Sequence, residues 1–157
     1  MKFMANLFQS SLVKAALWDA FQKLFGANKE KCRIYREAVG CQPGESIIDF
    51  GCATGITAEA FNDCNYLGVD INQGAIEWAK HKYRHEENID FICCDVETLK
   101  KHRFSRALCA GTGHHLSDPE IQKYHELLGA MVQNSGSVHF IDIIKTESDN
   151  VIMRLLM

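Results

Sequence analysis

Two acids and a glycine-rich turn are the residues of this chain whose spacing is best suited to chemistry. Residues 46–55 read SIIDFGCATG, and GVDIN follows at 68–72. An apolar strand, a glycine-rich turn and a helix form the first half of a nucleoside-binding α/β unit, and an acid about 20 residues later reads the ribose. Asp49 and Asp70 are 21 positions apart. The pattern therefore predicts a site for a ligand that carries a ribose.

The composition of the turn selects among such ligands. A dinucleotide turn has the pattern G-x-G-x-x-G and places a pyrophosphate at the helix N-terminus. Counted from Gly51, the third position is Ala53 and the sixth is Ile56, where close helix packing requires glycine. Asp49 would repel a pyrophosphate, and residues 46–79 contain no Lys or Arg. S-adenosylmethionine has no phosphate and carries an ammonium and a sulfonium, so the charge balance favours it over a nicotinamide cofactor.

With these motifs the sequence resembles the class I S-adenosylmethionine-dependent methyltransferases, and the order of the motifs carries the resemblance. Residues 47–55 resemble the first motif, with Ala53 where the family has a third glycine, and 68–71 resemble the second. Residues 91–96 (FICCDV) resemble the third motif, and 104–116 (FSRALCAGTGHHL) resemble the fourth strand and the loop after it. The helix and the fifth strand of the family then match 118–132 and 137–144.

The resemblance implies roles for individual residues. Asp70 would bind the ribose hydroxyls, Ile71 would lie against the adenine, and Asp95 would accept from the adenine amino group. Asp49 would act on the methionine ammonium at the mouth of the loop, or accept from loop N–H groups. Asp70 and Asp95 have an alternative role as helix caps, which Asn72 can take over from Asp70. The predicted cofactor-binding residues are Asp49, Gly51, Cys52, Ala53, Thr54, Gly55, Asp70, Ile71, Asp95, Val96 and Gly111.

His114 and His115 follow the fourth strand, at the carboxyl edge where open α/β sheets bind ligands. Methyl transfer mainly requires donor and acceptor to be held in line, and a base can remove the acceptor's proton. One of the two histidines is the candidate base, since imidazole titrates near neutral pH. The resemblance favours the alternative that they pack against the cofactor loop. No Cys, His, Asp or Glu stands at ligand spacing with them, so no metal site is expected.

The elements that must position these residues alternate strictly. Apolar runs predict strands at 46–50, 65–70, 89–94, 104–110 and 137–144, and helical periodicity predicts helices at 30–39, 56–63, 72–86, 118–134 and 148–156, with a short turn near 97–101. Such alternation predicts an α/β fold with a doubly wound, Rossmann-like, mostly parallel sheet in three layers. The resemblance implies the strand order 3-2-1-4-5. Residues 45–157 would form the cofactor-binding core, and 1–40 a helical lid or a packing cover.

Composition limits the function further. The 157 residues predict one domain, and a net charge of −3 gives no electrostatic case for a nucleic-acid partner. The loop AGTG at 110–113 also lacks the Asn/Asp-Pro-Pro-aromatic pattern of enzymes that methylate nucleobase amines, so a small-molecule substrate is expected. The seven cysteines form no C-x-x-C motif, which is typical of reduced thiols in a cytoplasmic protein. No apolar run is long enough for a membrane span.

The end of the chain departs from the family pattern. Members usually carry two strands after the fifth, and this sequence stops at Met157. It is therefore either a fragment or a naturally short protein, and its fifth strand would form a bare sheet edge that promotes self-association. The main functional prediction is a methyltransferase that acts on a small molecule. The alternatives are a degenerate S-adenosylmethionine-binding domain and, less favoured, a NAD-dependent oxidoreductase.

Overall fold

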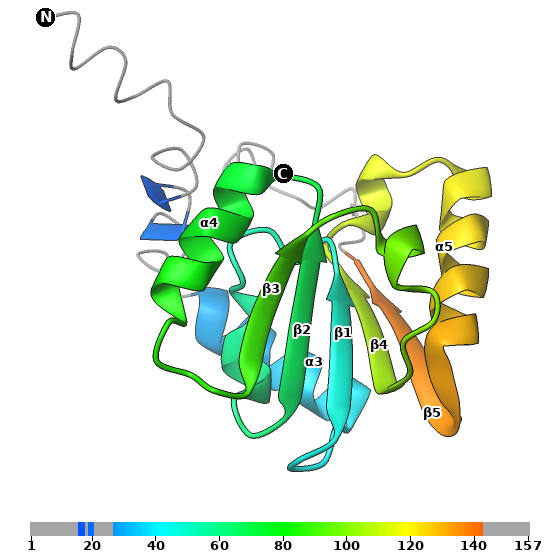
Figure 1. Ribbon diagram of the computed structural model, residues 1–157, viewed down its shortest axis with the longest axis horizontal. Helices are drawn as coiled ribbons and strands as arrows, with labels where there is room; N and C mark the ends of the chain where they lie inside the picture. Colours follow the sequence, from blue (N-terminus) through cyan, green and yellow to red (C-terminus); the bar gives the residue numbers. More distant parts are fainter. Residues whose placement is uncertain (1–15, 18, 21–26, 143–157) are drawn as a thin grey trace, which may run out of the picture.

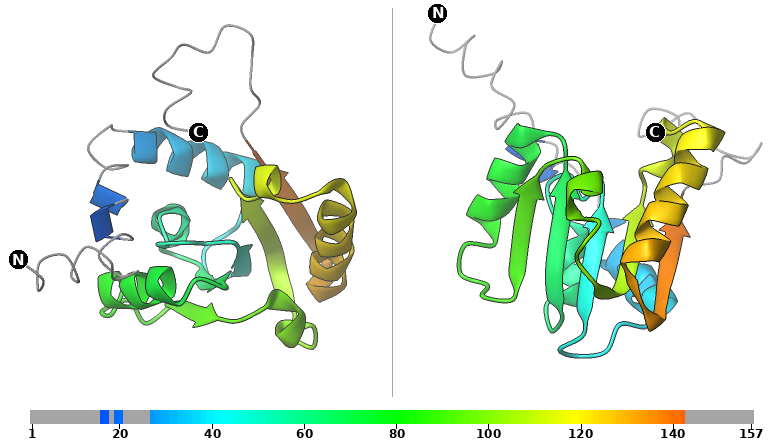
Figure 2. Two further views of the ribbon diagram at one scale, coloured as in Figure 1. Left: turned by 90° about the horizontal axis from the view of Figure 1, so that it is seen from above. Right: turned by 45° about the vertical axis from the view of Figure 1, so that its right-hand side comes forward.

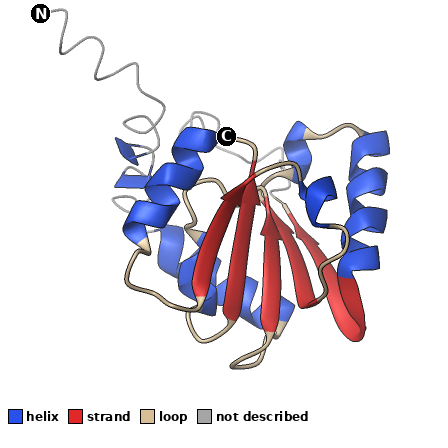
Figure 3. Cartoon of the chain, viewed as in Figure 1, coloured by secondary structure: helices blue, strands red, loops and turns tan. Residues whose placement is uncertain are grey.

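A five-stranded parallel sheet forms the centre of the computed structural model, which describes residues 16–17, 19–20 and 27–142. The strands are β1 (Ser46–Phe50), β2 (Asn65–Asp70), β3 (Ile89–Cys93), β4 (Phe104–Ala110) and β5 (Val132–Ile141). Their order is β3-β2-β1-β4-β5, and every neighbouring pair is parallel. Figure 3 shows the five arrows pointing the same way. The predicted fold class and strand order are confirmed, whereas the helix predicted at 148–156 lies outside the described residues.

Helices cover both faces of the sheet (Figures 1 and 2). The elements are α3 (Ala27–Val39), η1 (Thr57–Phe61), α4 (Gln73–Lys82), η2 (Val96–Leu99), η3 (Gly113–His115) and α5 (Asp118–Met131), where η marks a 3₁₀ helix. One core packs the sheet against α3, η1 and α4, and a second core packs the other face against η2 and α5. This is the expected three-layer arrangement, and it leaves the carboxyl edge of the strands for the site.

β1 shows why the sequence forms a central strand. Ile47 lies in the core beneath α3 and α4, and Ile48 lies in the core beneath η2 and α5. Both side chains are fully buried. A strand that is covered on both faces needs an unbroken apolar run rather than alternation. Successive side chains of a strand point to opposite faces of the sheet. Asp49 therefore lies on the same face as Ile47, where its carboxylate contacts Tyr66.

Two helix predictions are corrected in length. The helix expected at 56–63 is the short 3₁₀ segment η1, and the helix expected at 72–86 is α4, which ends at Lys82. Nine residues, 56–64, separate Gly55 from Asn65 at the start of β2, and five of them form η1. The face that such a helix would cover is covered by α3, which packs against η1.

The junction of α5 and β5 also differs from the prediction. Gly136 was expected to end a helix at about 134, but α5 ends at Met131 and β5 begins at Val132. The pairing with β4 shifts register between Phe104–Val132 and Arg106–Ser137, which makes residues 133–136 an irregular segment within the strand. A Cβ at Gly136 would lie 2.3 Å from the Ser105 carbonyl oxygen, so glycine permits this close strand contact.

The described part of residues 1–40 packs against the rest of the molecule. The Lys82 ammonium of α4 lies 3.5 Å from Asp19 and 2.9 Å from Glu59. Asp19 is buried, so this ion pair holds the helical segment around it against α4.

The seven cysteines are all free thiols within the described residues. The buried ones are Cys41, Cys52, Cys64 and Cys109, and the half-buried ones are Cys32, Cys93 and Cys94. Burial raises the pKa of both the Cys41 and the Cys109 thiol to about 12, so these two are inert thiols of the core rather than nucleophiles.

Candidate functional site

The glycine turn after β1 is shaped by close contacts with its neighbours. The N–H groups of Gly51 and Cys52 both donate to the Val69 carbonyl of β2, at 2.8 and 3.2 Å. Gly51 has φ +76°, and a Cβ there would lie 2.3 Å from Thr112 Oγ1. Gly55 has φ +72°, and its Cβ would lie 2.7 Å from the Phe91 ring. Both positions therefore require glycine for conformation and for space.

Asp70, at the end of β2, joins the turn to the next helix. One carboxylate oxygen accepts from the Ala53 N–H at 2.9 Å, and the other accepts from the Asn72 N–H at 2.8 Å. Asn72, not Asp70, is the N-cap of α4, because its side chain accepts from the Ala75 N–H. The helix-cap alternative for Asp70 is therefore excluded. The half-buried carboxylate lies beside the glycine turn at the carboxyl edge of the sheet.

Asp49 lies beneath the glycine turn and not at its surface. Only 1% of its surface is exposed, and its carboxylate accepts from the Tyr66 hydroxyl at 2.5 Å. Burial raises the pKa of Asp49 to about 7, although hydrogen bonds from Tyr66 and Thr57 lower it and the nearby Asp70 raises it further. A carboxylate in this position supports the turn from below, and its charge depends on pH in the neutral range.

Ala53 adopts a conformation that glycine would adopt more easily. Its φ is +46°, and it is the only residue other than glycine with positive φ in the described part of the chain. The turn thus keeps the left-handed geometry that the family's third glycine would have, at an energetic cost from the alanine methyl group.

We expect Ala53→Gly to stabilise the protein by about 1 kcal/mol, because removal of the methyl group relieves this strain. Urea unfolding measures the change. Ala60→Gly is the matched control, since Ala60 in η1 has no positive φ and its replacement should destabilise the fold. A destabilised Ala53→Gly variant would show that the turn does not hold this geometry in solution.

The other predicted cofactor residues fall into two groups. Ile71, directly after Asp70, has 80% of its surface exposed, and Asp95 is exposed as well. Asp95 also caps η2 by accepting from the Glu97 N–H at 3.0 Å, so its alternative role as a cap is confirmed. Cys52, Thr54, Gly55 and Val96 are buried. The Val96 side chain belongs to the core beneath α5.

Thr54 and Gly111 have features that are unusual for turn residues. The Thr54 hydroxyl is buried and has no hydrogen-bond partner within the described residues. Gly111, at the end of β4, has φ +65°, and nothing lies within 4 Å of where its Cβ would be. The backbone there therefore borders open space, unlike the crowded backbone at Gly51.

The two histidines after β4 belong to the 3₁₀ helix η3. Thr112, just before it, donates its hydroxyl to the Gly51 carbonyl at 3.4 Å, which joins this loop to the glycine turn. The rings of His114 and His115 lie 3.9 Å apart. His114 contacts Asp142, with Nδ1 lying 2.9 Å from Asp142 Oδ1 and the backbone N–H donating to Oδ2 at 2.6 Å. The structure thus brings both histidines to the carboxyl edge beside the turn.

Sequence reasoning missed three side chains of this site. Tyr66 and Thr57 bind Asp49, and Asp142 binds His114. Asp142 lay inside the predicted strand 137–144, whereas β5 ends at Ile141 and places Asp142 at the carboxyl edge. A strand prediction that ended before Asp142 would have identified this acid as a site residue.

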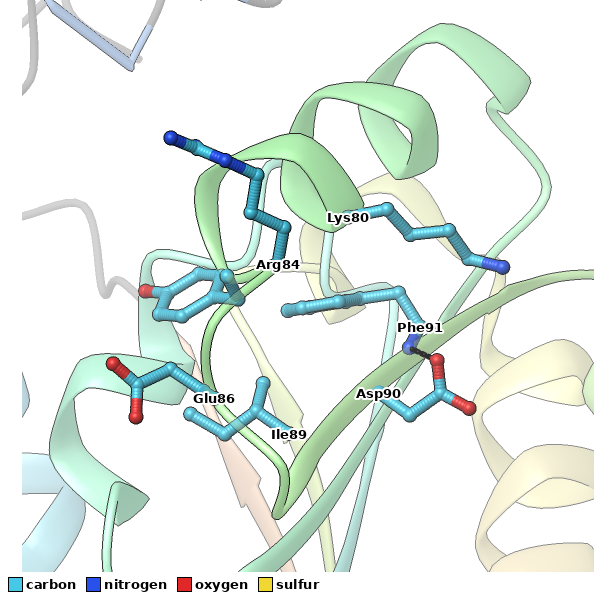
Figure 4. A pocket seen from close by; sticks show the side chains of 7 residues that line it. Lys80, Arg84, Glu86, Ile89, Asp90 and Phe91 are labelled. Atoms are coloured by element: carbon cyan, nitrogen blue, oxygen red, sulfur yellow. Dashed lines mark hydrogen bonds between the residues drawn. The ribbon is translucent and has the colours of Figure 1, made fainter.

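A separate pocket of about 240 Å³ lies between the end of α4 and β3 (Figure 4). Its lining includes Tyr83 and Phe91 but none of the predicted site residues. The Tyr83 hydroxyl donates to the Gly55 carbonyl at 2.7 Å, so the pocket lies behind the glycine turn and not at the carboxyl edge. Its charged residues are of both signs, with Lys80 and Arg84 beside Glu86 and Asp90.

The described residues contain no group of three or more His, Cys, Asp or Glu side chains arranged to hold a metal ion. Within the same ranges, no helix has the length and apolar character to cross a membrane.

Comparison with known proteins decides the family. A family model described as a methyltransferase domain matches residues 47–136, which is more than half of the chain. The chain belongs to the class I S-adenosylmethionine-dependent methyltransferases. Among its relatives is the ubiquinone biosynthesis O-methyltransferase of Coxiella burnetii, which is 30% identical over 105 residues. A ribosomal protein L11 methyltransferase of Paraburkholderia xenovorans is 42% identical over 43 residues, or 26% of this chain and 14% of that protein.

Solved structures share the methyltransferase fold. The YcgJ protein of Bacillus subtilis superposes with a TM-score of 0.66 at 22% identity, over 76% of this chain and 53% of that chain. Coclaurine N-methyltransferase, bound to N-methylheliamine and S-adenosylhomocysteine, has a TM-score of 0.61 at 20% identity, over 73% and 35%. The match with the Coxiella enzyme covers 64% of this chain and 44% of that enzyme. This methyltransferase chain therefore spans less than half of the length of that curated relative.

The residues at the carboxyl edge fit S-adenosylmethionine. Asp70 ends β2 and Asp95 follows β3 at this edge, whereas Asp49 of β1 is buried beneath the turn. Ile71 exposes an apolar side chain next to Asp70. The buried Thr54 hydroxyl lacks a partner among the described residues, and the backbone at Gly111 borders open space. An acidic, partly apolar edge with room beside its backbone suits a cationic nucleoside without phosphate.

Proposed function

We propose that this chain binds S-adenosylmethionine at the carboxyl edge of its sheet and transfers the methyl group to a small molecule. The observation that carries the proposal is the pair Asp70 and Ile71. Asp70 offers a carboxylate that is already aligned by two N–H groups, and Ile71 exposes 80% of its surface beside it. The Asp70 carboxylate can accept hydrogen bonds from the hydroxyl groups of a ribose, and the Ile71 side chain can pack against the face of an adenine. When bound, S-adenosylmethionine supplies a methyl group activated by a sulfonium.

The nature of the acceptor is part of the same proposal. The Coxiella relative is an O-methyltransferase by name, which supports an oxygen acceptor. The loop after β4 reads AGTG and lacks the pattern of enzymes that methylate nucleobase amines, and the net charge of −3 also disfavours a nucleic-acid substrate.

Free thiols that are buried in the core support a reducing, cytoplasmic location. A degenerate binding domain is the alternative, and Ala53, which stands where the family has a glycine, retains the left-handed geometry of the turn.

Calorimetry and a transfer assay test the proposal. S-adenosylhomocysteine should bind and NAD⁺ should not, and labelled S-adenosylmethionine should transfer its methyl group to members of a panel of phenols, alcohols and amines. Binding without transfer to any member would favour the degenerate domain. Failure of S-adenosylhomocysteine to bind would overturn the proposed function.

Replacement of Asp70 by asparagine tests the placement of the nucleoside. We expect Asp70→Asn to weaken S-adenosylhomocysteine binding by about 1–3 kcal/mol, or roughly 5- to 150-fold, the scale of hydrogen bonds to a charged group. Asp90→Asn on β3 is the matched control, because Asp90 is an exposed aspartate outside the site. Unchanged affinity in a folded Asp70→Asn variant would remove Asp70 from the ribose site.

We also propose that two copies of the chain associate through β5. In the described residues β5 is the last strand of the sheet, and its outer edge pairs with no other strand. Its side chains Val138 and Phe140 are only partly buried. An open edge of this kind favours pairing with a second chain. Light scattering should report dimers or larger species as concentration rises, and a monomer mass at every concentration would contradict the proposal.

A further inference from the structure

The contact between His114 and Asp142 has the form of a base with its positioning residue. Asp142 follows the end of β5, and His114 lies in the loop after β4, so two neighbouring strands bring them together. Both carboxylate oxygens of Asp142 face His114, one at its Nδ1 and one at its backbone N–H. A Cβ on Gly113 would lie 2.8 Å from Asp142 Oδ2, so the glycine before His114 makes room for this approach.

The chemistry of the contact assigns the tautomer. An ionised carboxylate can only accept hydrogen bonds, so the Nδ1 atom that lies 2.9 Å from Asp142 Oδ1 must carry the proton. A neutral imidazole with its proton on Nδ1 has its lone pair on Nε2. The ring is within reach of a ligand, because 40% of the His114 side chain is exposed. The hydrogen bond from Thr112 to Gly51 holds the same loop against the glycine turn.

We infer that His114 is the general base of methyl transfer, that Asp142 is its positioning residue, and that the acceptor is a hydroxyl group. This inference rests on the proposed function. In the step, the acceptor oxygen forms a bond to the methyl carbon and the carbon–sulfur bond breaks, with its electron pair kept on sulfur. The hydroxyl proton passes to Nε2 of His114. A hydroxyl acceptor needs such a base because its oxygen is a weak nucleophile while it carries the proton.

Asp142→Asn tests the positioning role with little change in shape. The asparagine carbonyl can still accept from the His114 N–H, but its NH₂ group must donate to Nδ1, which moves the imidazole proton to Nε2. In protein labelled with ¹⁵N-histidine, NMR should find His114 protonated on Nδ1 in the wild type and on Nε2 in Asp142→Asn. The matched control is Asp118→Asn, an exposed aspartate in the first turn of α5, which should leave the tautomer unchanged. A wild-type His114 protonated on Nε2 would overturn the inference.

Kinetics and binding then separate this inference from the proposed function. With catechol as the probe acceptor, Asp142→Asn and His114→Gln should each lower kcat by about 100-fold or more, and the double variant should lose little more. Binding of S-adenosylhomocysteine should stay within about twofold in each variant, because neither side chain is assigned to the nucleoside. Normal kcat in either single variant would overturn the inference and leave the proposed function intact. If the wild-type protein does not bind S-adenosylhomocysteine, the proposed function is refuted, whichever nitrogen atom of His114 carries the proton.

Discussion

Gly55→Ala is expected to destabilise the folded protein by about 2–5 kcal/mol. The backbone at Gly55 has φ +72°, where an alanine is strained. Its Cβ would also lie 2.7 Å from the Phe91 ring and 3.2 Å from the Tyr83 ring. These two rings pack against the core and contact each other, with centroids 5.4 Å apart, so moving them away from an alanine methyl group costs packing energy. Chemical unfolding followed by circular dichroism measures the loss.

Gly44→Ala is the matched control for this change. Gly44 also has positive φ, at +80°, but nothing lies within 4 Å of where its Cβ would be. Its replacement should cost only the backbone strain, about 1–2 kcal/mol. The difference between the two variants therefore isolates the steric contact beneath the glycine turn. Equal losses would mean that the Phe91 ring moves freely and that the turn is not held from below.

The buried Asp49 is expected to make stability fall as pH rises through the neutral range. The pKa of Asp49 is about 7 in the folded protein and 3.8 for the ordinary carboxyl group. Between these values the unfolded chain has lost the proton that the folded protein retains, so each rise in pH favours unfolding. The free energy of unfolding of the wild type, relative to Asp49→Asn, should fall by about 2–4 kcal/mol between pH 4.5 and 8.

Two further variants check the origin of this slope. Tyr66→Phe removes a hydrogen bond that favours the ionised carboxylate, so the pKa of Asp49 should rise and the fall should move to higher pH. Asp63→Asn is the control of opposite sign, because the hydrogen bond from Arg36 lowers the pKa of Asp63 below its usual range. Its effect on stability should be constant between pH 5 and 8. A difference in unfolding free energy between the wild type and Asp49→Asn that does not change with pH would show that the carboxyl group is hydrated in solution.

The amino-acid sequence by itself determined the succession of strands along the chain and the residues of the glycine turn, and the strand order in the sheet followed from the family resemblance. Strands such as β1 and β2 are buried on both faces, so their apolar runs are continuous and their ends are marked by acids. The position of Asp70 beside the turn follows from that pattern, because parallel strands end at one edge. Helical periodicity also placed the start of α5 at 118, where the structure shows a capping box formed by Ser117 and Glu120.

Only the tertiary structure decided where the acids point and which residues support them. Asp49 and Ile48 are adjacent in sequence, yet the sheet directs them to opposite faces, and only folding brings Tyr66 to the Asp49 carboxylate. Asp142 meets His114 from 28 residues away because the irregular start of β5 sets where that strand ends. Contacts between distant segments depend on register and on strand length. Local composition does not encode these quantities, so the partners of the site residues emerge only when the strands are packed together.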